Sequence, residues 1–368
     1  MANASMSYSK KQPHTTFPNP ILHPHTDPTF SLPRTTLAIP TPSQNHLSLS
    51  PTRLSRMRPL LLTLDAFNTL FHPRLPVPTQ YAHSASIFNI TISPSALQPA
   101  FSASYKSRSA SHPNYGRELA LRGEYAGPRR WWEDVIRGCF ERALAENPTA
   151  NSMGGNRVPD ALVQDLLERF ASARGYKLYD DVEPFLKEVR AQEMKAGQGK
   201  GRKVVIGVVS NSDDRISSVL ESLAVSVRDA RAGEEKKRAG GDLPGFEEER
   251  EKEKTTNPPQ NQNQKDIDFI VTSYQVGAEK PDPLVWDVAT RTALQLTGDS
   301  DAGDVGVGGW ERIHIGDDYG KDYRGAIGAG WEAYYLARDA EAAAQVPEGT
   351  KVITSLLDLL PKLSAGGS

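Results

Sequence analysis

Apolar and polar positions along the chain follow two different periods. Uninterrupted apolar runs, which are typical of strands buried on both faces, occur at 60–64 (LLLTL), 203–212 (KVVIGVVSNS), 266–273 (DIDFIVTS), 312–318 (RIHIGDD) and 333–337 (AYYLA). Helical spacing predicts helices between them, at 213–224, 281–296 and 321–329, and in TSLLDLLPKL near the end of the chain. Strands that alternate with helices predict the α/β class, with a Rossmann-like open parallel sheet and helices on both faces.

A long helical segment separates the first two predicted strands. Its three stretches with helical spacing are SPSALQPAFSASYKSR, RRWWEDVIRGCFERALAEN and PDALVQDLLERFASARG. The apolar stripe of the second stretch consists of Trp132, Val135, Ile136, Cys139 and Phe140. Because the segment is too long for a loop, it predicts a helical insertion over 76–199 in an α/β core formed by 58–75 and 200–368.

Two other segments are polar and lack either period. Residues 1–57 are rich in Pro, Ser, Thr, His and Asn and contain one acidic residue, Asp27, which predicts a disordered N-terminal extension. The same acid-poor composition also fits a mitochondrial presequence, although its prolines oppose the amphipathic helix of such a signal. Residues 228–265 are first charged and then rich in Asn, Gln and Pro, which predicts a disordered insertion that buries no apolar surface.

Composition and charge narrow the class of protein. The 368 residues are 38% hydrophobic and carry a formal net charge of −2, so charge gives no reason to expect nucleic acid as a partner. The single cysteine, Cys139, excludes an internal disulfide and fits a reducing compartment. No apolar run reaches the roughly 18 residues of a membrane span. A cytoplasmic or nuclear location is expected, and the N-terminal extension leaves a mitochondrial one open.

Polar residues follow the predicted strands at their carboxyl ends, which is where open parallel sheets form their sites. The residues supplied there are Asp65, Asn68 and Thr69 after the first strand, Ser210 and Asn211 at the second, Lys280 after the third, and Asp317, Asp318 and Asp322 after the fourth. A carboxylate can act as a covalent nucleophile, and clustered carboxylates suit Mg²⁺. A lysine and a hydroxyl can hold a phosphoryl group. Each residue alone fits an ordinary cap or turn, but their order along four strand ends points to one site.

Four short motifs resemble those of a known family of hydrolases. LDAFNTL, VVSNS, VGAEKPDP and HIGDDYGKD are similar, in order, to motifs one to four of the haloacid dehalogenase (HAD) superfamily. Through VGAEKPDP and HIGDDYGKDYRGA, the chain is most similar to the subgroup named haloacid dehalogenase-like hydrolase domain-containing protein 3. The resemblance covers about 58–75 and 203–364, and it implies that the inserted helices form a cap over the site.

The resemblance also implies roles for individual residues. Asp65 would be the nucleophile, with Ser210 and Lys280 as the other catalytic residues. Mg²⁺ would be held by Asp65, the backbone carbonyl of Phe67, Asp317, and Asp318 or Asp322. Asn68, Thr69 and Asn211 would contact a small, phosphorylated substrate.

One position departs from the phosphatases of this family. They carry a second aspartate two residues after the nucleophile, which protonates the leaving oxygen and then activates water; here it is Phe67. Loss of a positioned acid and base costs about 10²–10⁴-fold in rate. The dehalogenases of the family have an aromatic residue there, but they lack the acidic set that this chain retains in motif four.

Three interpretations therefore stay open. The first is a slow Mg²⁺-dependent hydrolase that acts on a small phosphorylated metabolite with a good leaving group, or that borrows an acid from the cap. The second is a metal-independent hydrolase of the dehalogenase type. The third is a non-catalytic binding or regulatory protein on the same scaffold. The retained Asp65, Lys280 and Asp317 favour the first interpretation, and the missing acid favours the third.

Overall fold

A computed structural model of the chain describes residues 58–147, 150, 157–196, 202–228, 243–246, 265–298 and 309–364. These residues all belong to one structural unit, Leu54–Ser368. The predicted N-terminal extension lies outside the described residues. Most of the predicted insertion at 228–265 also lies outside them.

Six parallel strands form the main sheet, in the order β5-β4-β1-β6-β7-β8. They are β1 (Leu60–Leu64), β4 (Val204–Ser210), β5 (Phe269–Thr272), β6 (Glu311–Gly316), β7 (Glu332–Leu336) and β8 (Val352–Ile353). The first five of these were predicted from their apolar runs, and the short edge strand β8 was not. The α/β class and the parallel sheet are therefore confirmed.

Successive side chains of the central strand β1 point to opposite faces of the sheet and enter two separate hydrophobic clusters. Leu60, Leu62 and Leu64 belong to one cluster, and Leu61 belongs to the other. Gly207 in β4 has no side chain because a Cβ there would lie 2.2 Å from the ring of Phe269. Both faces of the strands are thus buried, as the uninterrupted apolar runs predict.

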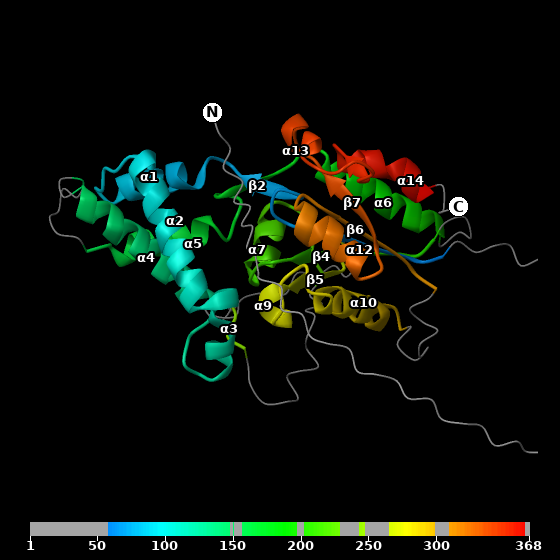
Figure 1. Cartoon of the computed structure of the whole chain (residues 1–368), viewed down its shortest axis with the longest axis horizontal. Helices are drawn as coiled ribbons and strands as arrows, with labels where there is room; N and C mark the ends of the chain where they lie inside the picture. The colour runs from blue at the N-terminus through cyan, green and yellow to red at the C-terminus, as the bar shows by residue number, and fades with distance from the viewer. Residues whose placement is uncertain are drawn as a thin grey trace, which may run out of the picture. The chain divides into compact units, whose positions relative to one another are not determined.

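Helices cover both faces of the sheet (Figure 1). The first cluster includes side chains of α6 (Val182–Ala196), α7 (Arg215–Ser222), η4 (Leu356–Leu359) and α14 (Leu360–Ser364). The second includes side chains of α10 (Leu284–Thr297), η3 (Tyr319–Arg324) and α12 (Gly325–Gly328). Two short helices, α9 (Ser273–Val276) and α13 (Ala340–Ala344), follow β5 and β7.

Five helices fill the predicted insertion. They are α1 (Val77–Ile87), α2 (Pro94–Ser111), α3 (Pro113–Leu121), α4 (Pro128–Glu146) and α5 (Asp160–Arg169). The predicted stripe of α4 is buried at Val135, Ile136, Cys139 and Phe140, whereas Trp132 is only partly buried. Figure 1 shows α1, α2, α4 and α5 grouped together.

The end of the predicted insertion differs from the expectation. The range 76–199 includes β3 (Tyr176–Leu178), which pairs antiparallel with β2 (Phe71–Pro73) of the core, and α6. Helix α6 packs on the main sheet, where Val182, Phe185 and Val189 are buried together with β1 and β4. Helical spacing predicts that α6 is a helix, but it does not say which partner its apolar face meets.

A short part of the predicted disordered insertion is packed against the core. Phe246 is 1% exposed, and its ring centroid lies 5.2 Å from the guanidinium carbon of Arg215 and 5.5 Å from that of Arg129. The backbone N–H of Phe246 donates to Asp214 Oδ1 at 2.9 Å, and the Tyr274 hydroxyl donates to the carbonyl of Pro244 at 2.6 Å. The expectation that 228–265 buries no apolar surface is therefore wrong for this segment, Leu243–Phe246.

Two variants should distinguish the packed segment, Leu243–Phe246, from the rest of the insertion. Replacing 247–264 with a Gly/Ser linker should leave the melting temperature unchanged, because that composition cannot form a core. Phe246→Ala should lower the free energy of unfolding by about 3–5 kcal/mol, because it empties a buried aromatic site. Denaturant unfolding of both variants measures the difference. Equal stability of Phe246→Ala and the unmodified chain would contradict the packing of Phe246.

No helix in the described ranges is long and apolar enough to cross a bilayer.

Candidate functional site

The carboxyl ends of the central strands bring the predicted residues to one edge of the sheet. Asp65 directly follows β1, and its backbone N–H donates to the carbonyl of Ile315 in β6 at 2.9 Å. Ser210 ends β4, which neighbours β1 on its other side, and Asp317 directly follows β6. Because β1 lies between β4 and β6, the residues at these three strand ends are adjacent.

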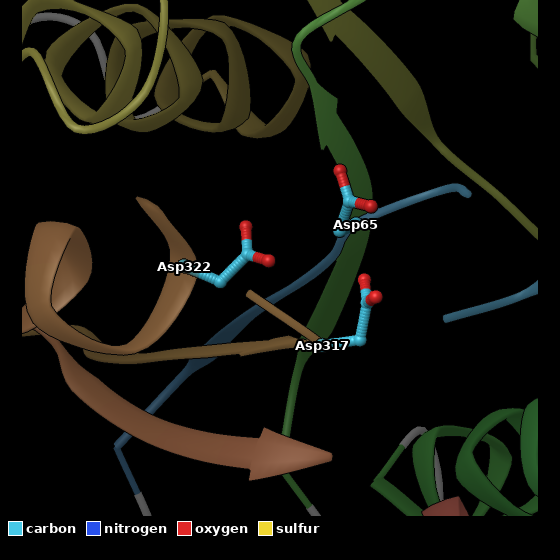
Figure 2. Close-up of side chains that lie close together, drawn as sticks. All are labelled: Asp65, Asp317 and Asp322. Carbon is cyan, nitrogen blue, oxygen red and sulfur yellow. The ribbon is translucent and has the colours of Figure 1, made fainter. Parts of the chain in front are cut away.

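Three carboxylates form the centre of the site. Asp65, Asp317 and Asp322 each place an oxygen within 4.8 Å of the others, and Figure 2 shows the three side chains close together. Asp65 and Asp322 are buried, and Asp317 is partly exposed. An all-oxygen set of anionic ligands is what Mg²⁺ binds in proteins. The donor set therefore fits a hard divalent cation.

Lys280 neutralises part of this charge. Its Nζ donates to Asp65 Oδ1 at 2.6 Å, to Asp322 Oδ1 at 2.6 Å and to the carbonyl of Val209 at 2.8 Å. The residue is 4% exposed, and its three N–H bonds are all used. Lys280 thus links the carboxylate after β1 to the carboxylate in η3.

Asn211 holds the backbone of Lys280. Its Oδ1 accepts from the Lys280 N–H at 2.7 Å, and its Nδ2 donates to the Lys280 carbonyl at 3.0 Å. Both ends of the amide are therefore engaged in fixing the loop after β5. The predicted role of Asn211 as a substrate contact is replaced by this structural one.

The acid groups of the cluster differ in their pKa values. Burial, together with the nearby Asp322, raises the pKa of Asp65 to about 6, although Lys280 lowers it. Burial and the charge of Asp65 raise the pKa of Asp317 to about 7. Burial alone would raise the pKa of Asp322, but Lys280 and His314 hold it below its ordinary value. Asp322 is therefore the fixed anion, and Asp65 and Asp317 repel each other when both are ionised.

The pKa values of the two basic groups, Lys280 and His314, shift in opposite directions. Burial would lower the pKa of Lys280, but Asp322 and Asp65 raise it above its ordinary value, so the lysine stays charged. Burial lowers the pKa of His314, which is 0% exposed. His314 is therefore packed inside the sheet, within β6.

Asp318 does not join the carboxylate cluster. Its Oδ1 accepts from the backbone N–H groups of Gly320 and Lys321, each at 2.9 Å, and its Oδ2 lies 3.1 Å from Lys321 Nζ. This is the geometry of a helix N-cap, which satisfies the free N–H groups at the start of η3. Of the two residues predicted to assist Asp317, the structure brings Asp322 into the cluster and turns Asp318 away.

Three other predicted residues surround the cluster. The buried Thr69 hydroxyl donates to Asp317 Oδ1 at 3.3 Å and so orients that carboxylate. Asn68 is exposed, in the left-handed conformation with a φ of 56°. Ser210 is 3% exposed, and its hydroxyl makes no hydrogen bond to another residue of the described ranges. The side chain of Asn68 hydrogen-bonds Asp317, so of these residues Ser210 is the one with an unengaged hydroxyl at the sheet edge.

Phe67 belongs to an aromatic group beside the site. Its ring centroid lies 4.9 Å from that of Phe71 and 5.6 Å from that of Tyr176, both in edge-to-face geometry. These partners come from the antiparallel strand pair β2 and β3. The side chain is thus packed as an apolar residue and supplies no proton.

The inserted helices contact the loop that follows β4. Trp132 Nε1 donates to Asp213 Oδ2 at 2.8 Å. Arg215 donates to both oxygens of Asp213, at 2.8 and 2.9 Å, and its guanidinium lies 4.4 Å from the Trp132 ring centroid. Neither Asp213 nor Arg215 is among the predicted site residues, because an aspartate and an arginine after a strand have no distinctive spacing.

Comparisons with known proteins were made by sequence and by structure. No family model matches the chain. The haloacid dehalogenase-like hydrolase domain-containing protein 3 of Mus musculus is 27% identical over 312 residues, which cover 84% of this chain and 95% of that protein. A putative uncharacterised hydrolase of Schizosaccharomyces pombe is 26% identical, over 75% of this chain and 89% of its own length.

The solved structures found by fold are more distant. A putative HAD-hydrolase, YfnB, from Bacillus subtilis, in a magnesium-bound crystal form, is 16% identical, with a TM-score of 0.43, over 84% of this chain and 99% of that one. A defluorinating L-2-haloacid dehalogenase is also 16% identical, with a TM-score of 0.45, over 83% of this chain and 94% of that one.

Proposed function

Because the chain belongs to the haloacid dehalogenase superfamily of hydrolases, close to the domain-containing protein 3 subgroup, we propose that it is a magnesium-dependent hydrolase with Asp65 as its nucleophile. Its substrate would be a small phosphorylated metabolite. The observation that carries the proposal is the convergence of Asp65, Lys280 and Asp317 at one sheet edge. A binding role alone needs no buried nucleophile beside a lysine.

The proposed reaction has two steps. A carboxylate oxygen of Asp65 attacks phosphorus while the bond from phosphorus to the leaving oxygen breaks, and the leaving group departs with the electron pair. Water then attacks the aspartyl phosphate, which releases inorganic phosphate and restores Asp65. Lys280 keeps Asp65 ionised and oriented through its 2.6 Å contact. The Ser210 hydroxyl and the amide of Asn68, whose side chain also hydrogen-bonds Asp317, would hold phosphoryl oxygens.

Asp65, Asp317 and the Phe67 backbone carbonyl would hold the metal, with Asp322 behind them. When bound, Mg²⁺ supplies positive charge to the phosphoryl oxygens and relieves repulsion among the carboxylates. Asp322 is better suited to orienting Lys280, because its Oδ1 already lies within hydrogen-bonding distance of Lys280 Nζ and His314 Nε2. Asp322 Oδ2 accepts from the Asp318 N–H at 3.0 Å.

Phe67 makes the proposed enzyme slow. No proton reaches the leaving oxygen from this position, so the leaving group must already be a stable anion. Aryl and acyl phosphates should therefore be hydrolysed faster than alkyl phosphates. The inserted helices would act as a cap, since they contact the loop after β4 through Trp132.

The packing of Phe67 also favours a second candidate, a non-catalytic binding or regulatory protein. Its ring is held in the aromatic group with Phe71 and Tyr176, so the position serves packing rather than proton transfer. The remaining interpretation, a metal-independent dehalogenase-type hydrolase, is weakened by the carboxylate cluster, which that chemistry does not need.

A substrate panel separates the three candidates. Aryl, acyl and alkyl phosphates and 2-haloacids should be tested with Mg²⁺ and with a chelator. We expect Mg²⁺-dependent release of phosphate from the aryl and acyl compounds only. Halide release that survives the chelator would support the dehalogenase type, and no turnover of any compound would support the binding protein.

Metal binding can be measured without turnover. Millimolar Mg²⁺ should raise the melting temperature, because a ligand that binds only the folded state stabilises it by mass action. Asp317→Asn should abolish the increase, since it removes one anionic ligand. Asp318→Asn is the matched control and should retain it, because Asp318 caps η3 and lies outside the cluster. An unchanged melting temperature of the unmodified protein in Mg²⁺ would count against the proposed metal.

A further inference from the structure

A buried histidine lies next to the carboxylate cluster and uses both of its ring nitrogens. His314 is in β6, is 0% exposed, and packs edge-to-face against Trp286 with ring centroids 4.5 Å apart. Its Nδ1 lies 2.9 Å from the hydroxyl of Thr63 in β1, and its Nε2 lies 3.2 Å from Asp322 Oδ1. Because it is fully buried, His314 cannot touch a substrate.

The two partners determine which nitrogen carries the proton. Asp322 is an ionised carboxylate and can only accept, so Nε2 must donate. In a neutral ring Nδ1 is then an acceptor, and the Thr63 hydroxyl donates to it. That hydroxyl also has the carbonyl of Ile313 as an alternative acceptor, but at 3.4 Å, against 2.9 Å to Nδ1. The shorter distance favours the bond to His314.

The hydrogen bond from His314 ends on the atom that holds Lys280. Asp322 Oδ1 accepts from His314 Nε2 and from Lys280 Nζ, and Lys280 Nζ also donates to Asp65 Oδ1. A continuous chain of contacts therefore runs from Thr63 through His314, Asp322 and Lys280 to the proposed nucleophile. Its members come from β1, from β6, from η3 and from the loop after α9.

We infer that His314 is a positioning residue: held at Nδ1 by Thr63, it directs its Nε2–H at Asp322, anchors that carboxylate and so sets where the Lys280 ammonium stands beside Asp65. The catalytic part of this inference rests on the proposed function. Without the N–H of His314, Asp322 would have Lys280 as its main restraint at Oδ1, and the lysine would be free to shift from Asp65. The effect should fall on the chemical step and not on substrate binding.

Matched variants at His314 and Thr63 test this chain of contacts. His314→Phe keeps a ring against Trp286 but removes the donor, and it should lower kcat for an aryl phosphate by about 10–100-fold with little change in KM. His314→Gln restores an N–H near the position of Nε2 and should recover most of the loss. Thr63→Val should lower kcat less than His314→Phe, and Thr63→Ser should resemble the unmodified protein. A purely structural role would lower the melting temperature of His314→Phe and leave kcat unchanged.

Nuclear magnetic resonance reads the tautomer without turnover. In protein labelled with ¹⁵N-histidine, the imidazole signals of His314, assigned by their absence in His314→Gln, should show a proton at Nε2. An Nδ1–H tautomer, which leaves Nε2 with no proton to donate, would overturn the inference, as would unchanged kcat in His314→Phe. An inactive unmodified protein would contradict the proposed function alone. The inferred anchoring would then be decided by the tautomer of the unmodified protein alone, and a ring with no proton at Nε2 would overturn it.

Discussion

Phe67→Asp should raise the hydrolysis of alkyl phosphates by about 10–10³-fold, at or below the range for a positioned acid and base. The substituted carboxyl would stand two residues after the proposed nucleophile, where it could protonate the leaving oxygen and later activate water. The gain should be largest for substrates with poor leaving groups. Steady-state rates on paired aryl and alkyl phosphates measure it.

Phe67→Asn is the matched control for this change. It removes the same ring from the contacts with Phe71 and Tyr176 and has nearly the same shape as aspartate, but it has no usable pKa. Both variants should lose a similar amount of stability, and only aspartate should gain activity. If Phe67→Asp folds normally and stays inert even on aryl phosphates, the binding-protein candidate should replace the hydrolase.

Lys280→Met should lower the free energy of unfolding by about 3–5 kcal/mol, the usual result of removing one partner of a buried ion pair. Methionine fills a similar volume but leaves Asp65 and Asp322 without their shared cation. Denaturant unfolding at constant pH measures the loss. Lys351→Met is the control, because Lys351 pairs with Glu332 on the surface and should cost less than about 1 kcal/mol.

The loss in Lys280→Met should depend on pH. Buried carboxylates without a cation have pKa values above those of the unfolded chain, so the folded state holds more protons between the two values. Stability of the variant should therefore fall as the pH rises from about 5 to 8. Added Mg²⁺ should restore part of it at the higher pH. Stability that does not change with pH would mean that the carboxylates are not buried together.

Much of the fold follows from the period of the apolar residues, and the exceptions have physical causes. The five longer strands are buried on both faces, so each leaves an uninterrupted run that can be recognised in the sequence. Strand β8 has two residues, and β2 and β3 have three each, which is too short for any period. The register of β2 with β3 depends on residues about a hundred positions apart.

The site was predictable in its location and less so in its details. Strand ends and motif order indicate Asp65, Lys280, Asp317 and Asp322. The sequence does not show which of Asp317 and Asp318 joins the carboxylate cluster and which caps η3. That depends on which carboxylate reaches the N–H groups of η3. The contact between His314 and Thr63 was also not predictable, since it depends on the register of two neighbouring strands, β1 and β6.

Phe246 has a consequence for how the chain could be engineered. It fixes the long connection between α7 and β5 at a point part of the way along, so the connection is divided into two shorter segments of chain. The entropic cost of closing a loop grows only with the logarithm of its length, about 0.6 kcal/mol for each doubling. A whole reporter domain could therefore be inserted between 247 and 264 at little cost. The inserted domain would begin next to Phe246, whose ring contacts Arg129 of α4 and Arg215 of α7. Such a fusion would therefore report on movement between the inserted helices and the sheet.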